Sequence, residues 1–354
     1  MLHAAHRAQG KLPGARLLEP AITPAERGFA VSPRLHQLLA GETALKDDPE
    51  ARALYYRDDG TPRPVGETLR NPALAQVLRR IAAEGPDAFY SGAVAQAIVD
   101  KVRSHATNPG RLSVADLAGY QPKRREAMCN DWRRYRLCGF PPPSSGHLAI
   151  MQMLGILDAM PRQTTQVLID GVPGPDFLHR YTEAARLAFA DRGQYVADPD
   201  FVAPPAGRWD SLLDQAYLTQ RANLVGETSM KTAKPGTPTA ARSPYASMAT
   251  QPEYGTSHLS IVDADGRAVA MTTTIEAQFG ARMMVHGFLL NNELTDFSLA
   301  PTGADGQPIA NRAQPGKRPR SSMSPTLVFE RDSGRLLMSA GSPGGALIIH
   351  FTAT

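Results

Sequence analysis

A change of residue pattern at position 256 constrains this chain more than any other feature. Residues 228–255 are rich in Ser, Thr, Pro, Ala and Lys and poor in large apolar side chains. Such a stretch buries too little apolar surface to offset the entropy of ordering, so we expect a mobile loop. Apolar side chains then alternate along Thr256–Val262 and Ala268–Thr274, with the turn Asp263–Gly266 between them. This pattern predicts a β-hairpin.

Helical patterns dominate the chain before this change. Apolar residues recur at helical spacing, and Asn71-Pro72 is a helix-start signature. Helices are expected over residues 1–40 with breaks at Pro13, Pro20, Pro24 and Pro33, and over 72–82, 89–102, 113–120, 147–160 and 177–192. Strands are expected over residues 132–138, 287–290, 326–329 and 336–340. The order predicts an α+β fold with a helix-rich first part and a sheet-rich second part.

Composition excludes two classes of function. The 354 residues are 42% hydrophobic and contain no apolar run long enough to span a bilayer, so a membrane-spanning protein is not expected. The net charge of +4 is small, and acidic and basic residues are interleaved, which argues against a nucleic-acid partner. We interpret the cluster Lys123, Arg124 and Arg125 as surface.

The cysteines and histidines do not predict a metal site. Cys129 and Cys138 lie nine residues apart without companion Cys or His spacing. Two partly buried free thiols are the favoured interpretation, and a disulfide across a hairpin is the alternative. The nine histidines form no H-E-x-x-H pair, and Met1–Gln9 lacks the features of a signal peptide. We expect no metal and no cofactor.

Thr256 is the first candidate for chemistry. Gly255 permits the strained backbone that self-attack by the next residue requires. If the bond between them breaks, Thr256 gains an α-amino group with an ordinary pKa of about 7.7–8.0, which suits a base for its own hydroxyl. By pattern alone, however, a threonine that opens a strand after a loop is more often an ordinary strand residue.

Several segments together resemble a known family. They are Gly28–Ser32, Pro141–Gly146, Leu187–Arg192 followed by Asp198-Pro199, Thr256–His258, Gly287–Ser298, Lys317–Pro325 and Gly341–Gly345. On these segments the chain is identified as a member of the gamma-glutamyltransferase family of N-terminal nucleophile hydrolases. The resemblance covers nearly the whole length.

The resemblance implies roles for the residues around Thr256. Thr256 matches the nucleophile that self-cleavage after Gly255 exposes, and Thr274 matches the threonine that hydrogen-bonds the nucleophile's hydroxyl and supports cleavage. Gly344 and Gly345 match the pair whose N–H groups hold the oxyanion of the tetrahedral intermediate. In isolation, Ser342–Gly345 is simply a turn.

The resemblance also implies a binding site for a gamma-glutamyl group. Glu293 and Asp296 match residues that hold the substrate's α-amino group, and Ser321 and Ser322 match residues that bind its α-carboxylate. Glu276 stands where well-studied transferases carry an asparagine that contacts the amino group.

Three departures bear on the substrate. Besides Glu276, the family's carboxylate-binding arginine belongs to an N-terminal stretch outside this chain, and Leu299–Arg320 is shorter than the usual lid and contains no aromatic residue. These features are similar to the family's lidless branch, which includes beta-lactam acylases.

The resemblance implies a four-layer αββα sandwich. Residues 1–255 would form a large-subunit-like region, with 228–255 as a linker before the cleavage point. Residues 256–354 would form a small-subunit-like region that is incomplete at its C-terminus, and the shortened chain is expected to expose sheet edges. A periplasmic or secreted location follows by analogy with the family.

Three functions are therefore considered. The first is cleavage or transfer of a gamma-glutamyl group from glutathione-like donors, with water or an amino acid or peptide as acceptor and the chain's own two fragments as partners. The second is an acylase acting on other amides, such as a glutaryl beta-lactam, with the same nucleophile. The third is a non-catalytic remnant of the family.

Overall fold

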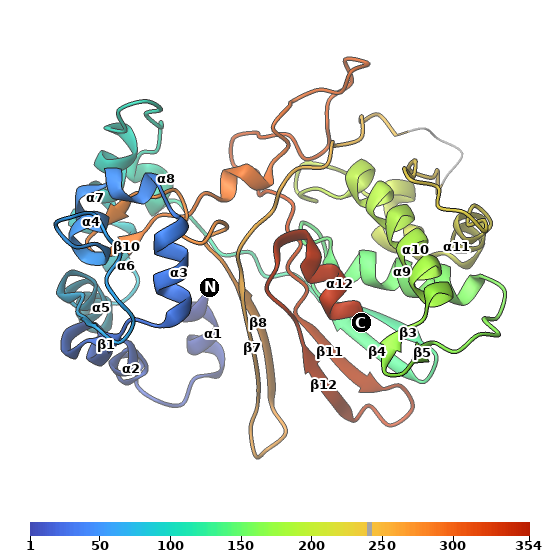
Figure 1. Cartoon of the computed structure of the whole chain (residues 1–354), viewed down its shortest axis with the longest axis horizontal. Helices are drawn as coiled ribbons and strands as arrows, with labels where there is room; N and C mark the ends of the chain where they lie inside the picture. Colours follow the sequence, from blue (N-terminus) through green and yellow to red (C-terminus); the bar gives the residue numbers. More distant parts are fainter. Residues whose placement is uncertain (239–242) are drawn as a thin grey trace. The chain divides into compact units, whose positions relative to one another are not determined.

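A computed structural model describes residues 1–238 and 243–354, which divide into two units (Figure 1). Unit 1 comprises Met1–Arg124 and Gln278–Asn292, and unit 2 comprises Arg125–Ala277 and Glu293–Thr354. Helices and sheets both occur, so the predicted α+β class is confirmed. The predicted regions 1–255 and 256–354 are defined by a cleavage point, whereas these units are defined by packing. The predicted regions therefore stay a prediction.

Unit 1 is mainly helical. Its helices are α1 (Leu2–Gln9), α2 (Gly14–Arg27), α3 (Pro33–Gly41), α4 (Pro49–Tyr55), α5 (Pro72–Glu84), α6 (Asp87–Tyr90), α7 (Gly92–Arg103) and α8 (Val114–Ala118), with a 3-10 turn at Ala44–Asp47. Two short antiparallel pairs accompany them, β1 (Phe29–Ala30) with β2 (Thr68–Leu69) and β9 (Met284–Val285) with β10 (Phe288–Leu289).

The expected helix breaks at Pro20 and Pro24 are wrong, because α2 runs through both. Each proline removes one backbone donor and normally destabilises a helix interior by about 3 kcal/mol. The two prolines lie four residues apart on the exposed side of α2, where the carbonyls that lack a donor can face water. On the opposite side Ile22 and Ala25 are buried in a core cluster with Ala75 of α5.

The predicted helix start at Asn71 is confirmed, and it has a second use. The Asn71 side chain accepts a hydrogen bond from the Leu74 N–H at 3.1 Å and donates one to the Gly287 carbonyl at 2.7 Å. Gly287 has a φ of 81°, and a Cβ there would lie 2.1 Å from Asn71 Oδ1. Only glycine fits this approach.

Unit 2 contains a four-stranded antiparallel sheet in the order β12-β11-β4-β3. Its strands are β3 (Met128–Trp132), β4 (Tyr135–Gly139), β11 (Thr326–Glu330) and β12 (Leu336–Ala340). The single strand expected over residues 132–138 is therefore wrong: the chain turns at Arg133, whose φ is 55°, and forms a hairpin. Strands from the helix-rich part thus pair with strands from the sheet-rich part.

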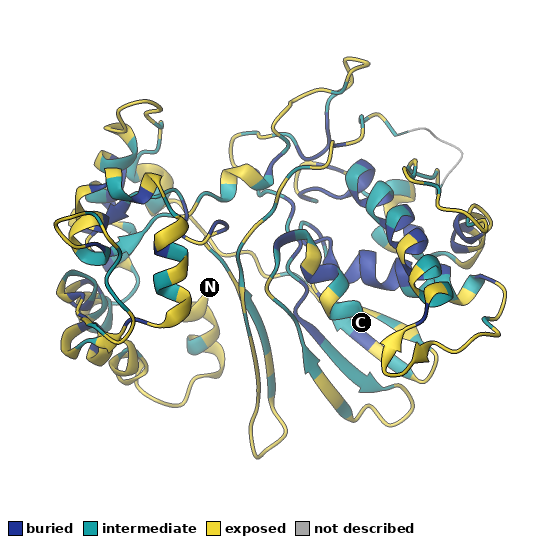
Figure 2. Cartoon of the chain, viewed as in Figure 1, coloured by how far each residue is buried: buried dark blue, intermediate teal, exposed yellow. Residues whose placement is uncertain are grey.

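Helices cover one face of this sheet (Figure 1). Helix α9 (Gly146–Ala159) packs on β3 and β4 and against α10 (Pro175–Tyr195) and α11 (Gln215–Ala222). Figure 2 shows that α9 is buried along almost its whole length, as its apolar sequence predicts. The other elements are β5 (Leu168–Ile169), β6 (Val172–Pro173), α12 (Ile348–Ala353) and 3-10 turns at Pro205–Gly207, Trp209–Leu213, Glu293–Asp296 and Gly345–Leu347.

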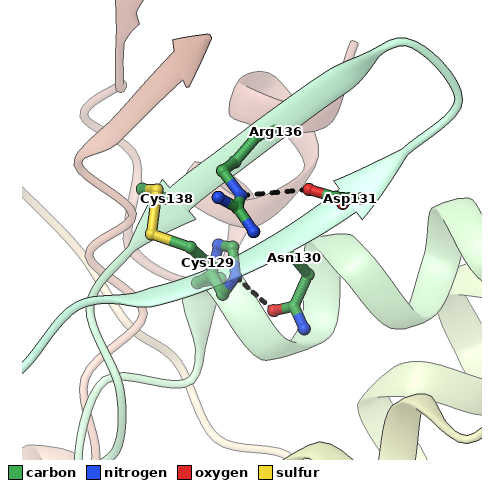
Figure 3. The surroundings of a disulfide bond; sticks show 6 residues. Cys129, Asn130, Asp131, Arg136 and Cys138 are labelled. Atoms are coloured by element: carbon green, nitrogen blue, oxygen red, sulfur yellow. Dashed lines mark hydrogen bonds and ion pairs between the residues drawn. A yellow bond between two sulfur atoms is a disulfide. The ribbon is translucent and has the colours of Figure 1, made fainter. Parts of the chain in front are cut away.

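Cys129 and Cys138 form a disulfide across the β3–β4 hairpin (Figure 3). The favoured interpretation of two free thiols is therefore wrong. The two residues are direct cross-strand partners with Cα atoms 4.1 Å apart, close to the spacing of the nearer kind of antiparallel pair. Sequence could not settle this pairing, because it depends on where the hairpin turns.

The hairpin predicted after residue 256 is confirmed as β7 (Ser257–Val262) and β8 (Ala268–Thr273). It lies beside β12, where Ser260 Oγ donates to the Ser339 carbonyl at 3.0 Å. Apolar side chains on its strands remain exposed, including Ile261 and Val269.

The expected loop before this hairpin contains neither helix nor strand in its described parts, 228–238 and 243–255; residues 239–242 lie outside the described residues. Polar contacts attach it to α10. Asp191 accepts from the Gly236 N–H at 2.7 Å, Glu183 accepts from the Met230 N–H at 2.9 Å, and the Met248 N–H donates to the Gly193 carbonyl at 3.0 Å. The sequence argument considered apolar burial alone and therefore missed these anchors; mobility itself stays a prediction.

No helix among the described residues is both long and apolar enough to cross a membrane.

Candidate active site

The open end of the β7–β8 hairpin brings two threonine hydroxyls to one carbonyl. Ser257 pairs with Thr273, so Thr256 and Thr274 follow at the same end. Both donate to the Gly255 carbonyl oxygen at 2.6 Å. In this uncleaved chain Thr274 thus contacts the carbonyl rather than the Thr256 hydroxyl that the resemblance implied. Two donors polarise the carbonyl of the 255–256 bond.

These residues line a pocket in unit 2. Its lining consists of Glu253, Tyr254, Gly255, Thr256, Thr274, Glu276, Asp296, Ser321, Ser322, Met323, Gly345 and Ile348. Most of the residues singled out in the sequence therefore converge on one place, although they come from five separate segments. Glu293 and Gly344 lie outside this lining.

Glu293 nevertheless acts on the pocket through Asp296. Burial, together with the neighbouring Glu293 carboxylate, raises the pKa of Asp296 to about 8, and burial also raises the pKa of Glu293. The two side chains share a hydrogen bond, so the pair retains a proton at neutral pH. A cation placed beside them would favour release of that proton.

Ser322 belongs to a buried charged group that the sequence did not reveal. Its hydroxyl donates to Glu253 and accepts from Arg192. Arg192 also donates to Glu253 at 2.9 Å and to Ser145 Oγ at 2.8 Å. Although burial acts most strongly and in the opposite sense, the pKa of Glu253 is lowered, because Arg192 and Ser322 stabilise its charged form.

Ser321 is fixed by the turn that leads into α9. Its carbonyl accepts from the Ser145 N–H at 2.8 Å and from Ser145 Oγ at 2.7 Å, and its N–H donates to the Pro143 carbonyl at 3.0 Å. Its hydroxyl accepts from the Met323 N–H at 3.1 Å. The Pro141–Gly146 segment therefore positions the pair Ser321-Ser322.

Glu276 is buried at a backbone φ of 72°, a rare conformation for a residue with a side chain. Its N–H donates to Thr274 Oγ1 at 2.8 Å, and its carboxylate accepts from the Tyr254 N–H at 3.0 Å. Here Glu276 holds the segment before the 255–256 bond.

Gly345 faces the same segment. Its φ is 56°, and a Cβ on it would lie 2.2 Å from the Glu253 carbonyl oxygen, so no side chain fits. Gly344, with a φ of 132°, lies against Phe351 of α12.

Sequence reasoning missed Glu253, Arg192 and Arg320 as members of the site. Arg192 and Arg320 stood inside segments quoted for the resemblance, but nothing in a linear sequence shows that both reach Glu253 Oε1, at 2.9 and 4.0 Å. Glu253 stood in a stretch expected to be a loop. The described residues contain no group of three or more His, Cys, Asp and Glu side chains that could hold a metal ion.

Known proteins share both sequence and fold with this chain. The family described as gamma-glutamyltranspeptidase matches residues 1–354. A glutathione hydrolase proenzyme of Pseudomonas aeruginosa is 38% identical over 353 residues, which are 98% of this chain and 59% of that protein. The acylase ACY 1 proenzyme of Pseudomonas sp. strain SE83 is 35% identical over 342 residues, covering 96% of this chain and 56% of that protein.

A solved structure, the cephalosporin acylase from Bacillus halodurans, matches with a TM-score of 0.76 at 27% identity over 97% of this chain and 58% of that chain. The chain thus spans a little under three fifths of the length of these relatives. The match over its whole length shows that this chain belongs to the gamma-glutamyltranspeptidase family.

Proposed function

We propose that this chain is a self-cleaving amide hydrolase or acyltransferase that takes gamma-glutamyl groups from glutathione-like donors through an ester on Thr256. The observation that carries the proposal is the pair of 2.6 Å hydrogen bonds from Thr256 and Thr274 to the Gly255 carbonyl, at the edge of a pocket. The relatives named glutathione hydrolase support the donor class.

Cleavage begins with Thr256 Oγ1 attacking the Gly255 carbonyl carbon. The C–N bond breaks, the Thr256 nitrogen takes a proton, and Gly255 is left as an ester on Oγ1. Water then hydrolyses the ester, which leaves a Gly255 carboxylate, a free Thr256 hydroxyl and a free α-amino group. Thr274 stabilises the oxygen on which negative charge develops.

Turnover uses the same hydroxyl. The Thr256 amino group accepts the hydroxyl proton as Oγ1 attacks the gamma-amide carbonyl, and it returns a proton to the leaving amine. Water hydrolyses the glutamyl ester, or an amine intercepts it. The proposed roles of Gly344 and Gly345 are to stabilise the oxyanion, and those of Glu276, Glu293, Asp296, Ser321 and Ser322 are to hold the substrate's charged groups.

The deciding experiment is intact-mass measurement of the purified chain during incubation, beside a Thr256→Ala control. We expect two fragments that meet at Gly255 and Thr256 from the parent chain and one full-length chain from the control. A parent chain that stays whole under folding conditions would overturn the proposal and favour a non-catalytic member of the family.

A second candidate keeps the mechanism and changes the acyl group. The relatives named acylase and cephalosporin acylase favour it. Comparison of gamma-glutamyl and glutaryl p-nitroanilides separates the two, because the glutaryl group lacks the ammonium that Asp296 and Glu276 would bind. Faster release from the glutaryl substrate would identify an acylase.

A periplasmic or secreted location is part of this proposal. The Cys129–Cys138 disulfide supports it, because such bonds persist mainly in oxidising compartments.

A further inference from the structure

Residues 253–255, the segment directly before the 255–256 bond, contact three of the candidate site residues. The Glu253 carboxylate accepts a hydrogen bond from the Ser322 hydroxyl, and the Tyr254 N–H donates one to the Glu276 carboxylate. The Glu253 carbonyl oxygen packs against Gly345. The space left in the pocket, about 20 Å³, has room for little more than one water molecule. The segment therefore occupies space that a substrate would need.

Two buried guanidinium groups lie close to the Glu253 carboxylate. The Arg192 side chain is 7% exposed and donates to Glu253 Oε1 at 2.9 Å. The Arg320 side chain is 5% exposed, and its Nη2 lies 4.0 Å from the same oxygen. Two positive groups thus share one carboxylate, and Arg320 Nε has no hydrogen-bond partner in the described structure.

The two arginines need a negatively charged partner, which the Glu253 carboxylate supplies. Burial, with Arg192 as the second cause, lowers the pKa of Arg320 to about 9, so Arg320 still carries its charge at neutral pH. Leaving two buried cations without their counter-ion strongly destabilises the folded chain. If cleavage lets the segment that ends in Gly255 withdraw, another anion or water must replace the Glu253 carboxylate.

We propose that Arg192 and Arg320 form the positive wall of a carboxylate-binding subsite behind Ser322, which the Glu253 side chain fills before cleavage and the carboxylate of an acidic acyl substrate fills afterwards. The subsite rests on the proposed function for its use in catalysis. Its existence as an anion site does not depend on catalysis. Glu253 is then a built-in competitor that closes the site of the uncleaved chain.

Uncleaved variants allow the subsite to be tested directly. Binding of L-glutamate and of glutarate is measured by titration calorimetry on three chains: Thr256→Ala, Thr256→Ala with Glu253→Ala, and Thr256→Ala with Glu253→Gln. We expect both dicarboxylates to bind the Glu253→Ala chain at least about tenfold more tightly than the Thr256→Ala chain, because a charge-assisted contact to a carboxylate is worth about 1.5–3 kcal/mol. The Glu253→Gln chain keeps most of the side-chain volume and should bind weakly.

A fourth chain tests the arginine. It carries Arg320→Met in addition to Thr256→Ala and Glu253→Ala. Its affinity for glutarate should be about tenfold or more below that of the Thr256→Ala, Glu253→Ala chain, and circular dichroism checks that it folds. Equal affinity of the Thr256→Ala chain with and without Glu253→Ala would overturn the proposal, whether or not the arginine variant folds. Unchanged affinity in a folded Arg320→Met chain would also overturn it.

The two proposals fail separately. Binding is measured on chains that cannot cleave, so a parent chain that never cleaves leaves the anion subsite untouched. Conversely, if the parent chain cleaves itself but none of the variants binds a dicarboxylate, the proposed nucleophile stands and the proposed subsite is overturned.

Discussion

Unit 2 contains two antiparallel hairpins of similar length that have opposite surroundings. The β3–β4 hairpin lies under α9, pairs with β11 and carries the Cys129–Cys138 disulfide. The β7–β8 hairpin pairs only within itself among the described strands, and it exposes Ile261 and Val269. Its open end holds Thr256.

The more strongly supported hairpin carries none of the candidate catalytic residues. The first hairpin is held by a cross-link, a neighbouring strand and a helix, whereas the second depends on its own ladder and a few serine contacts with β12. Candidate catalytic groups thus stand at the open end of the less supported hairpin. Four predictions test this contrast, from the largest expected effect to the smallest.

The open end of β7–β8 should control self-cleavage. Thr274→Val removes one of the two donors to the Gly255 carbonyl and should slow cleavage about 100-fold or more, the usual effect of losing one donor to a developing oxyanion. Intact mass against time gives the rate. Thr273→Val, one residue earlier on an exposed position, is the matched control; equal rates for both variants would contradict a role for Thr274.

The β3–β4 hairpin should depend on its cross-link. Replacing Cys129 and Cys138 together by Ser should lower the free energy of unfolding by about 2–3 kcal/mol, the chain-entropy value for a sequence separation of 9. Urea unfolding monitored by circular dichroism measures it. Ser260→Ala in the other hairpin provides the comparison, and a loss no greater than for that variant would show that packing alone supports β3–β4.

Asp296, which lines the pocket at the open end of β7–β8, should make the folded chain less stable as pH rises. Asp296 keeps its proton in the folded chain up to about pH 8, whereas the unfolded chain releases it near pH 4, so the unfolded chain binds fewer protons between these values. Stability therefore falls with rising pH in this window. Relative to Asp296→Asn, the parent chain should lose about 1–2 kcal/mol between pH 5 and pH 8, below the one-proton limit of about 1.4 kcal/mol per pH unit, because Glu293 shares the proton.

Thermal or urea unfolding of both chains at the two pH values makes this measurement. Parallel pH profiles for the parent chain and Asp296→Asn would mean that Asp296 ionises normally in the folded chain.

The smallest effect is expected on the exposed face of β7. Ile261 is 57% exposed, and Ile261→Ala should lower the free energy of unfolding by only about 0.5–1 kcal/mol, within the range of strand propensity. Leu137 of β4 is 8% exposed, and Leu137→Ala should cost about 2–5 kcal/mol. Equal losses would indicate that Ile261 is covered in solution and that the two hairpins are supported alike.

Local patterns gave most elements of the fold. The turn at Asp263–Gly266 and the alternation around it predicted the β7–β8 hairpin, Asn71 predicted the start of α5, and the apolar run after Gly146 predicted buried α9. The patterns failed where a distant partner decides the outcome. Pro20 and Pro24 do not break α2, because packing of Ile22 and Ala25 outweighs a local propensity.

The candidate site divides in the same way. The residues around it were found through resemblance to a family, and their convergence in one pocket is a property of the fold. The Arg192–Glu253–Ser322 group was invisible in the sequence, since its members lie 61 and 69 residues apart.

By itself, the sequence determined the α+β class and the β7–β8 hairpin, because periodicity and turn chemistry act within a few residues. Thr256 became the residue to examine through the resemblance to a family. Tertiary structure alone decided the Cys129–Cys138 bond, the shared proton of Glu293 and Asp296, and the occupation of Ser322 and Glu276 by the segment before Gly255. These features depend on distances between groups far apart in the chain, and on burial, which strengthens electrostatic interactions only after the chain has folded.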